Sequence, residues 1–220
     1  MKIINKAKAL LKSILIPSKK YNSQIEYWEE RANKFGAKSV IHLGHSDEEY
    51  DSITKYQIDT LFPIYKDLLS GTESLILDFG CGPGRFTTEL SKMSNVKVIG
   101  IDPIQKLLDL APRSENVDYM LMEQGVIPIK DNTVDSIWIC LVFGSIIDSE
   151  VFDNTINEIN RVLKNKGTLF LVEKTSQDLS NKQTKNVDFY EKKFDFVNLK
   201  KVADYKDIND CYSVFVGVKS

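Results

Sequence analysis

The stretch that decides the fold spans residues 75–86 and reads Leu75-Ile76-Leu77-Asp78-Phe79-Gly80-Cys81-Gly82-Pro83-Gly84-Arg85-Phe86. Its apolar beginning predicts the end of a buried strand, and its end predicts a helix that starts near Gly84. The three alternating glycines let backbone approach a ligand where any Cβ would clash. Such a turn lies at the carboxyl edge of an open α/β sheet, where these folds bind their ligands.

The glycine spacing indicates which ligand this turn holds. A dinucleotide fingerprint needs Gly-x-Gly-x-x-Gly, whereas here the third glycine comes one residue too early and Arg85 takes the place of the missing one. Pro83 also lacks the backbone donor that a pyrophosphate would use. The stretch instead resembles the first motif of class I S-adenosylmethionine (SAM) dependent methyltransferases, acid-x-Gly-x-Gly-x-Gly. The resemblance implies SAM as cofactor, S-adenosylhomocysteine (SAH) as product, and the following cofactor-binding residues: Asp78, Gly80, Cys81, Gly82 and Gly84.

The bulk composition is that of an ordinary globular protein. The chain has 220 residues, of which 42% are hydrophobic and 27% charged, with a net charge of −2. This balance argues against a dedicated nucleic-acid binder, which usually has a basic surface. The three cysteines, Cys81, Cys140 and Cys211, are far apart, so we expect neither a zinc site nor a disulfide framework, and a cytoplasmic location. No apolar run is long enough for a transmembrane helix.

Residues 1–20 predict a basic amphipathic helix that ends before Pro17. Apolar side chains recur at helical spacing between residues 3 and 15, and four lysines occupy the other side. One interpretation is a helix that lies on an anionic membrane, as a peripheral contact at its inner face. The other is packing on its own domain or on a second subunit, which makes residues 2–16 a candidate homodimer contact.

From residue 73 onward, strands and helices alternate. Strands are predicted at 75–77, 96–101, 119–122, 136–141 and 168–172, and helices at 84–93, 104–111 and 150–163. The alternation predicts a parallel sheet with helices on both faces. Two final strands, at 196–205 and 212–219, form the antiparallel hairpin that the resemblance implies for a seven-stranded, Rossmann-like methyltransferase sheet.

The expected domains follow from this pattern. They are the N-terminal helix 1–20, a helical lid segment 21–71 and a SAM-binding core 72–220. Within the lid segment a helix is predicted from about residue 47 to 69, kinked or divided at Pro63.

Two further stretches carry the cofactor prediction. Asp102 ends the second strand and can accept both hydroxyls of a ribose, or cap the next helix ahead of Pro103; the two roles are compatible. Residues 122–135 resemble the family segment Gly-Asp-Ala-x-x-Leu-Pro-Phe-x-Asp-x-Ser-Phe-Asp. Aligned on its proline, Glu123 takes the place of the adenine-binding Asp, or is a solvated loop acid, and Gln124 adds a contact. Cys140 and Leu141 are expected at the methionine end, and Asp135 is expected to be structural.

Candidate catalytic residues lie outside these motifs. His42 and His45 are the only histidines, and either one could serve as a general base from the lid or simply be a surface residue. Glu173 ends the fifth strand, where it would face the acceptor or be an ordinary strand-end acid. Tyr27, Trp28 and Arg31 are candidates for substrate and lid contacts, with simple packing as the alternative. No carboxylate cluster is left over for a metal.

These observations favour a SAM-dependent methyltransferase that acts on a small molecule or a sugar, including a glycan precursor, at oxygen. An RNA or protein methyltransferase is the second interpretation, opposed by the charge balance and by the lack of the Asn/Asp-Pro-Pro-aromatic motif. A catalytically inactive, SAM-binding partner subunit is the third.

Overall fold

The computed structural model describes residues 23–42, 44–94, 96–177, 184–208 and 210–220. The amphipathic helix expected within residues 1–20, and with it the proposed membrane or homodimer contact, lies outside the described residues. None of the described helices combines the length and the apolar character needed to span a lipid bilayer.

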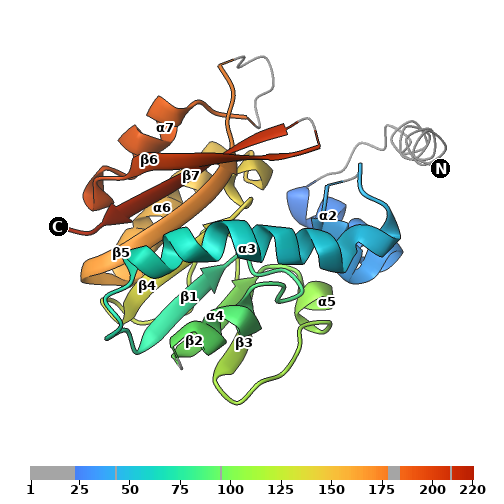
Figure 1. The fold of residues 1–220 in the computed structure, drawn as a ribbon, viewed down its shortest axis with the longest axis horizontal. Coiled ribbons are helices and arrows are strands. Elements are labelled where there is room, and N and C mark those ends of the chain that lie inside the picture. Colours follow the sequence, from blue (N-terminus) through green and yellow to red (C-terminus); the bar gives the residue numbers. More distant parts are fainter. Residues whose placement is uncertain (1–22, 43, 95, 178–183, 209) are drawn as a thin grey trace.

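A seven-stranded sheet forms the centre of the molecule (Figure 1). Its strands are β1 (Leu75–Phe79), β2 (Lys97–Asp102), β3 (Val117–Leu121), β4 (Val134–Cys140), β5 (Leu163–Lys174), β6 (Lys200–Asp207) and β7 (Asp210–Val218). They lie in the order β3-β2-β1-β4-β5-β7-β6. The first five are parallel, and β7 runs antiparallel between β5 and β6. The predicted Rossmann-like methyltransferase fold with its antiparallel hairpin is confirmed.

Helices cover both faces of this sheet. They are α2 (Gln24–Phe35), α3 (Tyr50–Leu68), α4 (Thr87–Ser94), α5 (Gln105–Leu108), α6 (Ser149–Val162) and α7 (Val187–Lys193), with short 3-10 helices at Gly36–Val40, Asp47–Glu49, Phe143–Ser145 and Asp195–Val197. Figure 1 shows α3 and α4 in front of the sheet and α6 and α7 behind it. The segment with α2 lies beyond the carboxyl end of the parallel strands, where it can cover a ligand.

Alternate residues of the central strands enter two apolar cores, one on each face. Along β4, Ile137 and Ile139 pack with α6 and α7, whereas Trp138 packs with α3 and α4. Trp138 stacks on Phe170 of β5 with ring centroids 4.6 Å apart. A strand that is buried on both faces must be apolar at nearly every position, which explains the unbroken apolar run that the sequence shows here.

The helix α3 is continuous through Pro63, so of the two expectations, a kink or a division, the division is wrong. Its buried residues Leu61, Phe62 and Tyr65 pack against the sheet, and Pro63 lies on the exposed side. Proline has no N–H to donate to the carbonyl one helical turn earlier, and water can hydrate that carbonyl on the exposed side. The packed face meanwhile stabilises the helix.

Several predicted boundaries shift for local reasons. The helix after the glycine turn begins at Thr87 and not near Gly84, because Gly84 has a left-handed φ of 72°. The sixth strand begins at Lys200 because a 3-10 helix and Asn198, at a φ of 47°, precede it. The sequence reading missed α2, although Ser23 caps it by accepting a hydrogen bond from the Glu26 backbone N–H at 3.1 Å.

Asp135 is structural, as expected. Its Oδ2 accepts hydrogen bonds from the backbone N–H groups of Ser74 and Leu75, each at 3.0 Å. Its Oδ1 accepts one from Lys164 Nζ at 2.6 Å. This carboxylate therefore fixes the entry of β1 beside β4 and β5.

We expect Asp135→Asn to lower the free energy of unfolding at pH 7 by about 1–3 kcal/mol, because it replaces a charged acceptor of several hydrogen bonds. Burial raises the pKa of Asp135, but the bonds from Lys164 and Ser74 outweigh it and leave the pKa lowered. The contribution is thus complete above the unfolded pKa of about 4 and is lost as pH falls below it. Urea unfolding at pH 7 and pH 3 measures this, and an equal difference between variant and wild type at both pH values would contradict it.

Candidate functional site

The turn after β1 is held by the neighbouring strand. The backbone N–H groups of Gly80 and Cys81 both donate to the Ile101 carbonyl, at 2.8 and 3.0 Å. A Cβ on Gly80 would come within 2.5 Å of the Val142 side chain, and one on Gly84 within 2.4 Å of the Tyr119 hydroxyl. These two glycines are therefore required by the protein's own packing, in addition to any ligand.

Asp102 joins this turn to the loop after β2. Its Oδ2 accepts a hydrogen bond from the Gly82 N–H and its Oδ1 one from the Ile104 N–H, both at 2.9 Å. Burial raises the pKa of Asp102 to about 6, even though these bonds favour its ionised form. Each carboxylate oxygen keeps a second lone pair, so the group can still accept the two hydroxyls of a ribose.

Asp78 is the second buried carboxylate at the turn. It is 2% exposed and accepts a hydrogen bond from the Thr87 hydroxyl at 2.6 Å. Burial, together with the charge of Asp102, raises its pKa to about 7. Burial thus raises the pKa values of both acids toward neutrality, as is common for carboxylates in functional sites.

A cavity opens at this edge of the sheet, between the glycine turn and the part of the predicted lid that precedes α3. We call this part alone the lid segment; it comprises residues 24–42 and 44–49. Ten of the predicted site residues line it: Trp28, Asp78, Gly80, Cys81, Gly82, Asp102, Pro103, Gln124, Cys140 and Leu141. Seven others do not: Tyr27, Arg31, His42, His45, Gly84, Glu123 and Glu173. Glu123 and Gln124 are both exposed, but only Gln124 lines the cavity.

The carboxylate of Glu173 holds the loop after β4. It accepts hydrogen bonds from the backbone N–H groups of Val142, Phe143 and Gly144, at 2.7, 2.6 and 3.3 Å. Burial raises its pKa to about 7 against the effect of these three donors. The side chain is 2% exposed and thus positions the loop that carries Val142 toward Gly80. A direct role on the acceptor stays a prediction.

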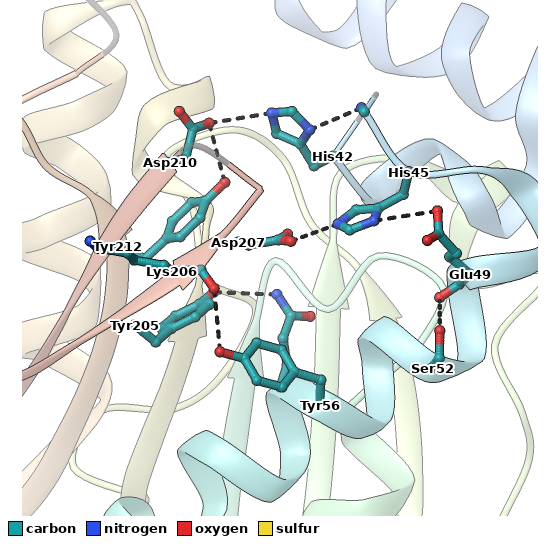
Figure 2. Close-up of polar contacts among 12 residues, drawn as sticks. His42, His45, Glu49, Ser52, Tyr56, Tyr205, Lys206, Asp207, Asp210 and Tyr212 are labelled. Atoms are coloured by element: carbon teal, nitrogen blue, oxygen red, sulfur yellow. Dashed lines mark hydrogen bonds and ion pairs between the residues drawn. The ribbon is translucent and has the colours of Figure 1, made fainter. Parts of the chain in front are cut away.

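The two histidines connect the lid segment to the hairpin of β6 and β7 (Figure 2). His45 Nε2 lies 2.7 Å from Asp207 Oδ1, and His42 Nε2 lies 3.3 Å from Asp210 Oδ2. The Gly44 N–H donates to His42 Nδ1 at 2.9 Å, so Nε2 of that ring carries a proton and faces Asp210. A role for either histidine as general base stays a prediction.

Helix α3 touches the same hairpin. The Tyr56 hydroxyl donates to the Lys206 carbonyl at 3.3 Å, and Gln57 Nε2 donates to the Tyr205 hydroxyl at 3.3 Å (Figure 2). The Tyr205 and Tyr212 rings stack with centroids 5.0 Å apart. The hairpin of β6 and β7 thus contacts both the lid segment and α3 and holds them in place.

Two side chains of α2, Trp28 and Arg31, have different roles. Trp28 faces the cavity. Arg31 is 7% exposed. The centre of its guanidinium lies 5.3 Å from the centroid of the Trp28 ring, and its Nε donates a hydrogen bond to the Ser39 carbonyl at 3.1 Å. Arg31 thereby orients Trp28 and ties α2 to the following 3-10 helix.

Sequence reasoning missed several residues of the cavity wall. Gln24, Ile25 and Val40 come from the lid segment, and Arg85 from the glycine turn. The run Ser23-Gln24-Ile25-Glu26 carries a helix-start signal that would have located α2. Arg85 was noted only as a replaced glycine, although a cation directly after a ligand-binding turn is itself a signal.

Known proteins resemble this chain in sequence and fold. Residues 76–167 match the family described as "Methyltransferase domain". An uncharacterized methyltransferase-like protein of Schizosaccharomyces pombe is 31% identical over 125 residues, which are 56% of this chain and 47% of that protein. Phosphoethanolamine N-methyltransferase 1 of Triticum aestivum is 26% identical over 157 residues, 68% of this chain and 30% of that protein. A SAM-dependent methyltransferase of Aquifex aeolicus has the same fold, with a TM-score of 0.59 at 20% identity, over 77% of this chain and 98% of that one.

The strand order, the glycine turn with its acid at the end of β2, and the match of residues 76–167 together support a class I SAM-dependent methyltransferase domain. SAM is the cofactor of this class. The chain spans less than half the length of the two curated relatives named above. No group of three or more His, Cys, Asp or Glu side chains in the described part of the chain could hold a metal ion.

We expect His45→Ala to loosen the lid segment, because the variant leaves the Asp207 carboxylate, 8% exposed, without its 2.7 Å partner. Hydrogen exchange followed by mass spectrometry should show faster exchange in peptides from residues 24–42 and unchanged protection in β4 and β5. His42→Ala is the matched control, since the His42 side chain is 36% exposed and its bond is longer, at 3.3 Å. Equal exchange of the lid peptides in His45→Ala and wild type would contradict the assignment.

Proposed function

We propose that this protein transfers a methyl group from SAM to a small-molecule acceptor, a sugar or glycan precursor among them. The observation that carries the proposal is the Asp102 carboxylate, which is tied to Gly82 of the glycine turn and lines the same cavity. SAM supplies a methyl group already activated on a sulfonium. The chain therefore has to bind, orient and exclude water.

The wall of the cavity is suited to these tasks. Asp102 would receive the ribose hydroxyls, Gln124 would lie at the adenine, and Cys140 and Leu141 would lie at the methionine end. Ile25, Trp28 and Val40 of the lid segment add an apolar cover, which keeps water from the sulfonium. Holding an acceptor in line behind the methyl, at roughly 3 Å, accounts for much of the rate that such a site supplies.

The acceptor atom depends on whether a base is at hand. The described residues that line the cavity include no histidine and no lysine. A hydroxyl acceptor usually needs a base to remove its proton, whereas an amine can lose its extra proton to water and then attack as the neutral amine. Transfer to nitrogen is therefore the second candidate beside the expected transfer to oxygen, and the name of the wheat relative, a phosphoethanolamine N-methyltransferase, agrees with it. Release of SAH with amines and alcohols of matched skeleton separates the two.

A location in the cytoplasm, with a peripheral membrane contact or a homodimer formed through residues 2–16, stays a prediction. An RNA or protein acceptor, or a partner subunit without activity, would show itself as SAM binding with no turnover of any small molecule.

We expect SAH to bind wild type with micromolar affinity and Asp102→Asn about 10- to 100-fold more weakly, because the variant loses a charged acceptor of two hydroxyls. Calorimetric titration of SAM and SAH measures this. Gln124→Ala serves as the control for a substitution at the rim of the cavity, and we expect it to weaken SAH binding less than Asp102→Asn does. Absence of binding to well-folded wild type would refute the proposed function.

The affinity should also depend on pH. The pKa of Asp102 is raised to about 6, and the ribose hydroxyls favour its ionised form, so SAH should bind up to about tenfold more weakly at pH 5 than at pH 7. Asp102→Asn should lose this dependence. Asp78, with a pKa raised to about 7, is the other titrating acid. Asp78→Asn is therefore the control, and its affinity for SAH should still fall as the pH decreases through about 6. A flat affinity from pH 7 to pH 5 in wild type would contradict the role of Asp102.

A further inference from the structure

Arg85 lines the cavity with Cys140, the residue proposed for the methionine end of SAM, and its charge is not used by the site described so far. It follows Gly84 of the glycine turn and contributes to the cavity wall beside Phe86 and Cys140. Among the described residues of that wall it is the single Lys, Arg or His. Its side chain is half-buried, and it borders the cavity.

The hydrogen-bond partners of Arg85 are neutral. Its Nε donates to Thr54 Oγ1 at 3.1 Å, and its Nη2 donates to Gln57 Oε1. The other end of the Gln57 amide is held by the Tyr205 hydroxyl at 3.3 Å, which fixes the orientation of the acceptor oxygen. None of the ion pairs among the described residues includes this guanidinium. Burial raises the pKa of Asp78, and the charge of Arg85 opposes this rise without a direct contact. Asp207, the acid of the nearby hairpin, is engaged by His45 at 2.7 Å.

A guanidinium has five N–H donors, and the two bonds to Thr54 and Gln57 leave three of them free of partners in the described part of the chain. An ion removed from water without a counter-ion loses solvation free energy. Burial accordingly lowers the pKa of Arg85. A ligand with a negative charge would restore that stabilisation and occupy the remaining donors.

The Phe86 ring, whose centroid lies 4.9 Å from the centre of the guanidinium, offsets part of this cost, but it leaves the remaining N–H groups without hydrogen-bond acceptors among the described residues. A neutral side chain could join Thr54 and Gln57 without the desolvation penalty of a cation. Thr54 and Gln57 orient the planar guanidinium of Arg85 but do not neutralise its charge. An oriented guanidinium can donate two parallel hydrogen bonds to the two oxygens of a carboxylate or a phosphate.

We propose that Arg85, oriented by Thr54 and Gln57, forms an anion-binding subsite at the methyl-donor end of the cavity, for a carboxylate or phosphate group. The proposal rests on the proposed function for the identity of the neighbouring ligand. The anion has two sources of the same chemistry: the carboxylate of the methionine part of SAM, or an acidic group on the acceptor.

The first arm of the test concerns the donor. Calorimetry compares SAH with its decarboxylated analogue, 5′-(3-aminopropylthio)-5′-deoxyadenosine, on wild type, Arg85→Gln and Arg85→Lys. If the donor carboxylate occupies the subsite, SAH binds Arg85→Gln at least about tenfold more weakly than wild type. The analogue then binds both proteins alike, and Arg85→Lys lies between, because it keeps the charge without the fork.

The second arm concerns the acceptor. Inorganic phosphate is titrated into the SAH complexes of wild type and Arg85→Gln at fixed ionic strength, with chloride as the matched anion. If an acceptor group occupies the subsite, SAH affinity is the same in both proteins. Phosphate then binds the wild-type complex, and this binding is lost in Arg85→Gln.

Either positive arm supports the subsite and names its source, and two negative arms overturn it. Near-ultraviolet circular dichroism and thermal unfolding establish that each variant is folded. If Arg85→Gln is not, Thr54→Val is used instead, which keeps the cation but removes the bond to Nε and should weaken the same ligand severalfold. If SAH fails to bind wild type, the proposed function fails, and titration of phosphate into the ligand-free proteins alone decides about Arg85.

Discussion

The hydrogen bonds of the Asp102 carboxylate are the interaction on which the rest of this site depends. One oxygen holds Gly82 in the turn after β1, and the other holds Ile104 at the start of α5. The two loops that follow β1 and β2 are thereby fixed to each other at the carboxyl edge of the sheet. A carboxylate buried to 7% exposure is unfavourable unless such donors surround it, and the same burial raises its pKa toward the range in which binding responds to pH.

The glycine turn is shaped by its protein neighbours as much as by a ligand. Val142 fills the space that a Cβ on Gly80 would need, and Val142 is itself placed by Glu173 through the backbone of residues 142–144. The loop after β4 therefore closes over the turn because a buried carboxylate on β5 holds it there. Three neighbouring strands, β1, β4 and β5, act together to form one wall of the cavity.

The opposite wall is assembled from segments far apart in the chain. Helix α2 packs through Ala32 on Ile104 and Leu107 of the α5 region, so the lid segment rests on the Asp102 side. At its other end the lid segment reaches the β6–β7 hairpin through His42 and His45. Antiparallel insertion of β7 beside β5 brings the tip of the hairpin to the ligand edge, since the start of β7 pairs with the end of β5.

The sequence by itself determined the class of fold, the turn after β1 and the acids Asp78 and Asp102, because strand period, glycine spacing and strand-end acids are local patterns. It could not show that Gln124 lines the cavity and Glu123 does not, that Glu173 binds a loop, or that His45 meets Asp207. Those outcomes depend on how segments separated by tens of residues pack, which no local period encodes. The charge of Arg85 was visible in the sequence, but only the tertiary structure decided that its partners are neutral, because Thr54 and Gln57 reach it from a separate helix.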